Sequence, residues 1–165
     1  MSGSFIVRVA TASDIELISW QRARMFTDMD KLPVELFESF RVQSLDVLDR
    51  MFKANEYIGW LASPQSRADQ IIAGAGVQLR QVPPHPRSDR NGKITIVAGR
   101  QAVIGNVYTE PEWRRRGVTA LLIKTIIEWT RGQAIDSLVL YAAAERRIVY
   151  EKLGFVAGSE MQFNL

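Results

Sequence analysis

Three consecutive arginines followed by a glycine, Arg114 to Gly117, are the residues of this chain whose types and order most directly suggest chemistry. They lie between a β-branched and aromatic run, residues 103–109, and a helical pattern that begins directly after the glycine. A strand, a tight turn and a helix N-terminus in this order form an anion site, because the first turn of a helix leaves backbone N–H groups without partners. Gly117 has no Cβ, so the backbone can approach a ligand closely there. The segment therefore predicts a site for a phosphorylated ligand.

The elements that must position this site begin with a short strand over residues 5–9, where apolar and polar residues alternate. Thr11 and Asp14 have the spacing of a capping box, which predicts the start of a helix over residues 12–28. Arg22 interrupts the apolar face of that helix, so part of the face is expected to line a cleft. A second helix is expected from Pro33 onward, because proline suits the first helical position.

The middle of the chain predicts strands. Residues 56–62 and 71–79 read as an antiparallel hairpin, and residues 94–109 as one or two strands broken near Gly99. The proline-rich segment 82–92 is expected to lack regular structure, since proline removes a donor and restricts φ.

The last third predicts a β-α-β unit. A helix is expected from Gly117 to Gly132, a short strand over residues 137–141 and a short helix over residues 145–153. Residues 155–157 and 161–165 are candidate final strands. A right-handed crossover would place residues 103–109 parallel to 137–141. Ligands bind at the carboxyl ends of such strands, which is where the arginines lie.

The composition is that of an ordinary globular protein, with 165 residues, 47% hydrophobic and 24% charged. The length predicts a single domain over residues 1–165. The net charge of +3 is low for a nucleic-acid binder. The chain has no cysteine and one histidine, which argues against a structural zinc site. No signal segment and no apolar run of ~20 residues is visible, so we expect a cytoplasmic protein with no metal and neither a nucleic-acid nor a membrane partner.

The segments around the arginines resemble the GNAT N-acetyltransferase superfamily. The acyl-CoA pyrophosphate loop of that family reads Q/R-x-x-G-x-G/A, and Arg114, Gly117 and Thr119 occupy its places. A second motif, Y-x-x-x-G-F, is matched by residues 150–155. The positions that usually precede the loop are occupied by Val107, Thr109, Pro111 and Trp113.

The resemblance implies a mixed α/β fold of the GNAT-like acyl-CoA N-acyltransferase type, with a mixed, mostly antiparallel sheet and a central β-α-β unit flanked by helices. It implies an N-acetyltransferase that uses acetyl-CoA as co-substrate and no metal. The acetyl group would pass directly, in a ternary complex, to a primary amine of a small molecule or to an exposed amino group. The alternative is a non-catalytic acyl-CoA-binding or sensing module on the same fold. The implied cofactor-binding residues are Val107, Tyr108, Thr109, Arg114, Arg115, Arg116, Gly117, Val118, Thr119, Ala120 and Tyr150.

Acetyl transfer to an amine needs a polarised thioester carbonyl, a neutral amine and a proton for the leaving thiolate. If the strand splays from its parallel neighbour, the N–H of Val107 or Tyr108 could serve the first need. Tyr150 is the candidate proton donor, and Glu110 is a candidate general base. Other carboxylates that could take the amine proton are Glu35, Glu38 and Glu160.

Two features of the sequence depart from the family pattern. Thr119 replaces the usual small residue at the third loop position, and its side chain either needs room or adds a hydroxyl donor. Ala143 cannot make the side-chain hydrogen bond to the pantetheine arm that a polar residue would make there, and Arg146 either reaches a CoA phosphate or faces solvent.

The acceptor site carries no motif. It is expected between the first two helices, the loop Met29 to Leu32 and the proline-rich segment. Acidic residues in this region suggest a cationic acceptor, although a solvated helix start explains them equally well. They are Asp28, Asp30, Glu35 and Glu38. Sheet edges near the C-terminus leave a homodimer open.

Overall fold

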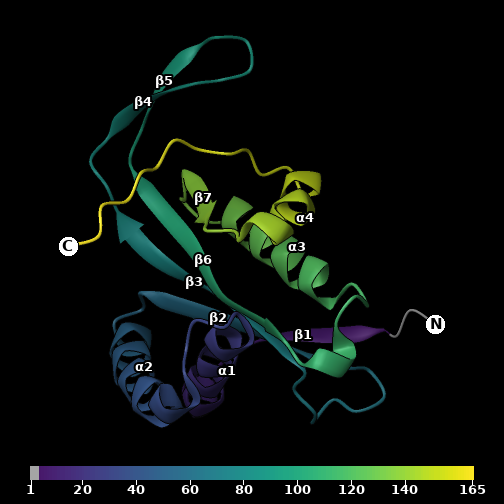
Figure 1. The fold of residues 1–165 in the computed structure, drawn as a ribbon. Coiled ribbons are helices and arrows are strands. Elements are labelled where there is room, and N and C mark those ends of the chain that lie inside the picture. The colour runs from purple at the N-terminus through teal and green to yellow at the C-terminus, as the bar shows by residue number, and fades with distance from the viewer. Residues whose placement is uncertain (1–3) are drawn as a thin grey trace.

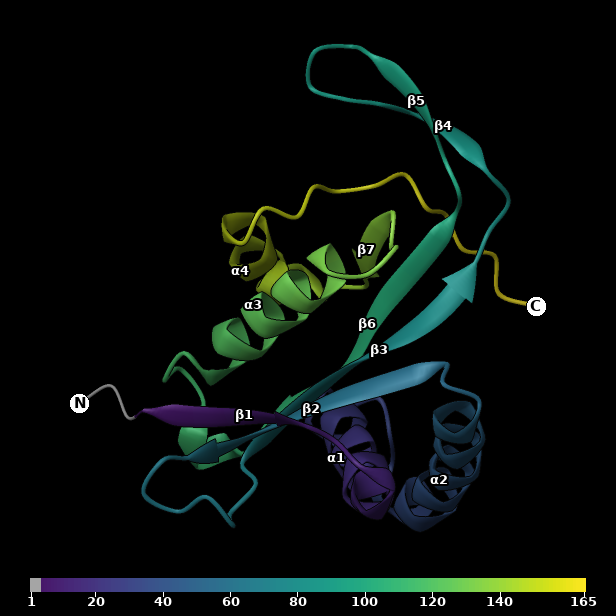
Figure 2. The same cartoon turned by 180° about the vertical axis from the view of Figure 1, so that it is seen from behind.

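The computed structural model describes residues 4–165, and its main feature is a five-stranded mixed sheet with helices on both faces (Figures 1 and 2). The strand order is β1-β2-β3-β6-β7, and all neighbours are antiparallel except β6 and β7. The strands are β1 (Phe5–Val9), β2 (Tyr57–Pro64), β3 (Ala73–Gln81), β4 (His85–Ser88), β5 (Ile94–Val97), β6 (Arg100–Thr109) and β7 (Ser137–Leu140). The helices are α1 (Ile15–Asp28), α2 (Phe37–Lys53), α3 (Val118–Arg131) and α4 (Arg147–Lys152).

The two faces of the sheet carry separate apolar cores, because side chains alternate along β2. Trp60 and Ala62 point to the α3 side, where Trp60 stacks edge-on against Trp129. Tyr57 and Leu61 point to the other side and pack against α1 and α2. The cartoon shows α1 and α2 together below the sheet and α3 above it (Figure 1). The sheet is therefore the middle layer of three.

A β-bulge in β6 changes which residues face which layer. The pairing of β3 with β6 shifts register between Gly74 and Gly76, and Asn106 lies there with φ 56°. Before the bulge, Ile104 belongs to the core on the α3 side. After it, Asn106 and Tyr108 contact side chains of the α1 side, although their even numbers would have kept them with Ile104. Bulges commonly re-aim side chains in this way.

Most predicted elements are confirmed. The first strand, the first two helices, the antiparallel hairpin and the parallel pairing of β6 with β7 all lie where the patterns indicated. The capping box at Thr11 and Asp14 is present. Short 3-10 turns precede α1, α2 and α4.

Two predictions were wrong. The proline-rich segment contains β4, which pairs with β5 as a separate two-stranded ribbon. Proline is tolerated there because each strand of a two-stranded ribbon has one free edge. The proposed final strands, residues 155–157 and 161–165, form no ladder, so within the described chain the β-α-β unit occupies one end of the sheet. Val156, Met161 and Phe163 are exposed in that tail, so the apolar pattern there had no partner strand to cover it.

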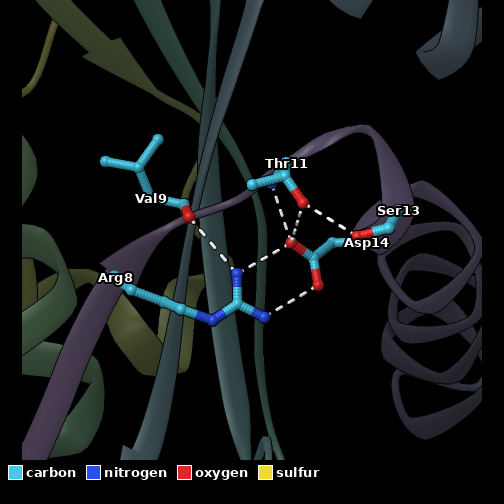
Figure 3. Close-up of polar contacts among 5 residues, drawn as sticks. All are labelled: Arg8, Val9, Thr11, Ser13 and Asp14. Carbon is cyan, nitrogen blue, oxygen red and sulfur yellow. Dashed lines mark hydrogen bonds and ion pairs between the residues drawn. The ribbon is translucent and has the colours of Figure 1, made fainter.

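The start of α1 is tied to β1 by a cluster of polar contacts (Figure 3). Both oxygens of the Asp14 carboxylate accept hydrogen bonds from the Arg8 guanidinium at 2.8 Å, and one also accepts from the Thr11 N–H at 2.7 Å. These donors, first among them Arg8, lower the pKa of Asp14 from 3.8 to about 2.

Neither a membrane-spanning helix nor a metal cluster is found in the described part of the chain. Within residues 4–165, no helix combines the length and apolar character needed to cross a bilayer, and no group of three or more potential metal ligands gathers.

Candidate functional site

The site begins where β6 and β7 separate. Their parallel pairing runs from Gln101 with Ser137 to Ile104 with Leu140 and then stops, while β6 continues to Thr109. The last residues of β6 therefore have a neighbour only on the β3 side. This is the splayed geometry expected from the sequence.

The direction of the backbone amides in this part of β6 favours Val107 over Tyr108 as a donor. The N–H of Glu110 donates to the Ile72 carbonyl at 2.9 Å, on the continuation of β3. Because residues two apart on a strand present their N–H groups to the same neighbour, Tyr108 is expected to face β3 as well. The N–H groups of Val107 and Thr109 then point toward the gap that β7 has left.

The loop after β6 presents backbone donors at the start of α3. Gly117 has φ 84°, and a Cβ placed on it would meet nothing within 4 Å. Arg115 is also left-handed, with φ 59°. The first N–H of α3 with an acceptor is that of Leu121, which donates to the Gly117 carbonyl. Among residues 4–165 the amides of residues 118–120 have no acceptor, which leaves them for an anion at the helix N-terminus.

The three arginines play different parts. Arg114 donates through Nε to the Thr109 carbonyl at 2.9 Å and forms an ion pair with Asp28 at the end of α1. Arg116 lies over the Trp113 ring, with 4.9 Å from its guanidinium carbon to the ring centroid. Arg115 forms no ion pair within the described residues. The contacts of Arg114 brace the loop against β6 and α1, and Arg114 also lines the cavity at the loop together with Arg115.

The unusual threonine of the loop has a partner. The hydroxyls of Thr119 and Thr109 lie 3.1 Å apart, so the first turn of α3 is joined to the end of β6. Both residues line a cavity of about 350 Å³ together with Gly117. The Thr119 side chain therefore fits within the loop and leaves the cavity open.

Three cavities meet along the splayed strands. The cavity at the arginine loop shares Tyr150 and Arg146 with a second cavity of about 710 Å³ that follows the gap between β6 and β7. That second cavity shares Arg22 and Asn106 with a third, of about 480 Å³, under α2. The shared lining residues place the three cavities side by side. They form a row, called the path below, from the helix N-terminus of α3, past the free edge of β6, to the layer of α1 and α2.

Tyr150 lies at the middle of this path. It is buried, with 7% of its surface exposed, and its ring packs edge-on against Phe155 at 6.0 Å. Burial raises the pKa of the Tyr150 phenol above its ordinary value, while the nearby Arg146 guanidinium acts in the opposite direction. Arg146 itself is exposed and lines two of the three cavities, so it can reach a ligand phosphate.

Glu110 lines none of the three cavities. Its carboxylate accepts a hydrogen bond from the Tyr108 hydroxyl at 3.2 Å, beyond the end of β6. The alternatives are no better placed: Glu38 is paired with Arg41 on the surface of α2, and Glu160 accepts from Tyr141 in the C-terminal tail. The assignment of a carboxylate base therefore stays a prediction without structural support.

Sequence reasoning missed a polar network at the far end of the path. Arg22 lines the cleft as its position on α1 suggested, and its Nη1 donates to the Asn106 side-chain oxygen at 2.7 Å. The Asn106 amide donates in turn to the Tyr57 hydroxyl at 3.1 Å. Gly76 makes room for this, because a Cβ on it would lie 2.1 Å from that hydroxyl. A lone asparagine beside a glycine in a strand was the only signal of the bulge that assembles the network.

Two of the four acidic residues that suggested a cationic acceptor are paired with arginines. Asp28 lies between Arg24 and Arg114, and Glu38 pairs with Arg41. Within residues 4–165 Asp30 and Glu35 form no ion pair, and Asp30 lines the cavity along β6. The cationic acceptor therefore stays a prediction.

The sequence matches the family model described as the acetyltransferase (GNAT) family over residues 17–155. Among solved structures, a GCN5-related N-acetyltransferase from Ralstonia eutropha JMP134 is similar, with 22% identity, a TM-score of 0.82 and coverage of 98% of this chain and 99% of that one. A predicted acetyltransferase with acetyl-CoA from Clostridium acetobutylicum has 24% identity, a TM-score of 0.76 and coverage of 98% and 96%. A glucosamine-6-phosphate N-acetyltransferase from Arabidopsis thaliana has 15% identity, a TM-score of 0.64 and coverage of 98% of each chain. At these identities the likeness shows the fold. The comparison with curated proteins gave no match.

Proposed function

Since the chain belongs to the acetyltransferase (GNAT) family, a family of acyl-CoA-dependent acetyl transfer, we propose that it is an N-acetyltransferase that uses acetyl-CoA. The acceptor is a primary amine of a small molecule or an exposed amino group, and transfer is direct within a ternary complex. The observation that carries the proposal is the row of three adjoining cavities, with the free edge of β6 along it. Such an arrangement fits two ligands that approach from opposite ends and react beside one strand.

The arginine-loop end of the path fits the pyrophosphate of the co-substrate. The amides of residues 118–120 supply donors, Gly117 leaves open space above the loop, and Arg146 adds positive charge. The pantetheine arm would then lie along Val107 to Thr109 in the gap left by β7, in the manner of an added strand. The Clostridium acetobutylicum structure named above, described as holding acetyl-CoA, supports this choice of ligand.

The bound co-substrate supplies a thioester, whose acyl group is already activated toward nitrogen. In this proposal the Val107 N–H donates to the acyl oxygen; a donor of this kind is worth about 3 kcal/mol in the transition state. As the new C–N bond forms and the C–S bond breaks, the amine loses a proton and the sulfur requires one. Tyr150 holds a proton beside the gap and is the proposed donor to the sulfur. Water is the proposed acceptor of the amine proton. No carboxylate lines the cavity under α2, and of the carboxylates that line the cavity along β6 (Asp28, Asp30 and Glu145), Asp28 is already paired with arginines.

The test is calorimetric titration of the protein with acetyl-CoA and with CoA, followed by a transfer assay across a panel of amines with release of the free thiol as readout. Micromolar binding together with acetylation of at least one amine is the expected result. Binding without transfer to any amine would leave the acyl-CoA-binding module instead. A folded protein that binds neither nucleotide would overturn the proposal.

A further inference from the structure

The cavity under α2 has an unusual electrostatic character. Among the residues that line it, Arg22 carries the only formal charge. The other polar groups on its wall are neutral and include Gln43, Ser44 and Gln78. A pocket of about 480 Å³ that contains one cation and several neutral hydrogen-bonding groups is suited to a small ligand rather than to a protein surface.

The Arg22 guanidinium has no anionic partner among residues 4–165. Its one hydrogen bond is to the side-chain oxygen of Asn106, a neutral amide. Asp28 and Asp30 line the adjoining cavity and are its carboxylates nearest to Arg22 in the sequence. Asp28 is paired with Arg24 and Arg114, and neither carboxylate forms an ion pair with Arg22. Tyr57 cannot supply a negative charge either, because burial raises the pKa of its phenol to about 12.

Holding Arg22 in this position has a desolvation cost that the fold offsets only in part. Burial lowers the pKa of its guanidinium, which means that the charged form is partly stripped of water. The ring faces of Phe26 and Phe40 lie 5.1 and 5.7 Å from its guanidinium carbon and hold it in place from the sides. These contacts direct the remaining N–H donors without neutralising the charge. Arg22 is half-buried, and charges that lose part of their water are normally paired, so the missing anion is expected from a ligand.

We propose that Arg22 binds an anionic group of the acetyl acceptor, so that the acceptor is a small amine that also carries a carboxylate or a phosphate. The inference rests on the proposed transferase function. A planar guanidinium with several free donors matches either oxyanion in a two-pronged geometry. The same charge repels acceptors that carry only positive charge, so the site would discriminate against them. Because Arg22 and Asn106 line both this cavity and the one along β6, an amine anchored here by its anion lies next to the strand that carries Val107.

The experiment compares matched acceptor pairs that differ only in the anionic group. They are γ-aminobutyrate with 4-aminobutanamide, glycine with glycinamide, phosphoethanolamine with ethanolamine, and glucosamine 6-phosphate with glucosamine. The wild type is expected to acetylate the anionic member of at least one pair with a kcat/KM at least tenfold above its neutral partner. The carboxylate and phosphate pairs then distinguish the two anion sources. Equal or better use of every neutral partner would overturn the inference.

Four variants separate the anion site from general damage. Arg22→Gln should abolish the preference by raising KM for the anionic acceptor, while Arg22→Lys should restore part of it. Asn106→Asp places a carboxylate on the guanidinium at almost unchanged volume and should also abolish the preference, because the cation is then paired internally. Arg50→Gln removes an arginine from the exposed surface of α2 and should change nothing. Retention of the preference in Arg22→Gln would overturn the inference.

A direct binding measurement keeps the outcome independent of transfer. The Arg22 Nε–H signal, identified in a nitrogen-15 spectrum by its absence from Arg22→Gln, is followed while propionate or inorganic phosphate is added in the presence of CoA. A saturable shift with either probe supports the anion site even if no amine in the panel is acetylated. No saturation up to high millimolar concentration would overturn it, whereas failure of acetyl-CoA to bind in the calorimeter concerns the proposed function alone.

Discussion

The two ends of the row of cavities are built from different chemical groups. At the α3 end the donors are the backbone amides of residues 118–120, in the first turn of the helix after Gly117. At the α2 end they are side chains, supplied by Arg22, Asn106 and the neutral polar residues around them. A backbone site depends on local conformation and binds the constant part of a ligand, whereas a side-chain site changes with each substitution. The first end therefore suits a shared co-substrate and the second suits a particular acceptor.

The largest effect is expected at the backbone end. Gly117→Glu should weaken acetyl-CoA binding by at least about 100-fold, because a left-handed φ strains any other residue and the carboxylate repels phosphate. Calorimetric titration measures the loss. Gly92→Glu is the matched control, since Gly92 has φ 78° and equally open space but lies in the distant β4–β5 ribbon. Equal weakening in both variants would mean that the loop is not the nucleotide site.

The difference between the ends also explains what could be predicted from the sequence. The arginine loop lies within a few residues of one strand and one helix, so its spacing alone indicated an anion site. Arg22, Tyr57 and Asn106 are far apart in the chain and meet only because a bulge turns Asn106 to the α1 face. Strict alternation along the strand places Asn106 on the same face of the sheet as Ile104. The alternation of residues in the sequence therefore could not have predicted the network.

The predictions that failed depend on strand pairing rather than on local signals. The exposed Val156, Met161 and Phe163 have strand-like composition, but a strand needs a pairing neighbour, and no ladder joins the described tail to β7. The strand β4 was missed for the opposite reason, because proline was read as excluding a strand that a free edge permits; its partner β5 lies within the predicted strands of residues 94–109.

The next effect tests the middle of the path. Tyr150→Phe should lower kcat by about tenfold or more and leave the Kd for acetyl-CoA nearly unchanged, because it removes a proton donor without changing the packing on Phe155. Initial rates at saturating substrates measure it. Since burial raises the pKa of this phenol, any alkaline fall in kcat that it causes should lie above pH ~10 and disappear in the variant.

Tyr108→Phe is the control for this prediction, because it removes a phenol whose hydroxyl bonds to Glu110 outside the three cavities. Turnover should be little changed. If Tyr150→Phe changed turnover no more than Tyr108→Phe does, Tyr150 would have no part in the proton transfer. Glu110 would then again be a candidate for the general base.

A smaller effect is expected from the ion pair between Arg114, in the loop before α3, and Asp28, at the end of α1. Each of Arg114→Gln and Asp28→Asn should cost about 0.5–1 kcal/mol of unfolding free energy and weaken acetyl-CoA binding a few-fold, because the loop loses its brace to α1. The double variant should cost little more than either single one. Denaturant unfolding and calorimetry measure both quantities. Additive losses in affinity would mean that Arg114 binds the phosphate itself.

The smallest effect is expected at the N-terminal cluster, which lies outside the path. Asp14 has its pKa lowered to about 2 by Arg8 and the Thr11 amide, so its contribution is complete above pH ~4 and is lost as the pH falls toward 2. Asp14→Asn should therefore lower the free energy of unfolding by about 1 kcal/mol at pH 7 and by almost nothing at pH 2. The value at pH 7 is discounted for solvent screening, because the Arg8 side chain is 47% exposed. Urea unfolding of the wild type and the variant across this pH range measures how their stabilities converge.

Asp46→Asn, which breaks the exposed pair with Arg50, is the control and should change stability by less than about 0.5 kcal/mol at either pH. Neither variant should alter acetyl-CoA affinity or acceptor preference. A change in either property with Asp14→Asn would show that the position of α1 is set by this cluster, and that Arg22 depends on it through the helix.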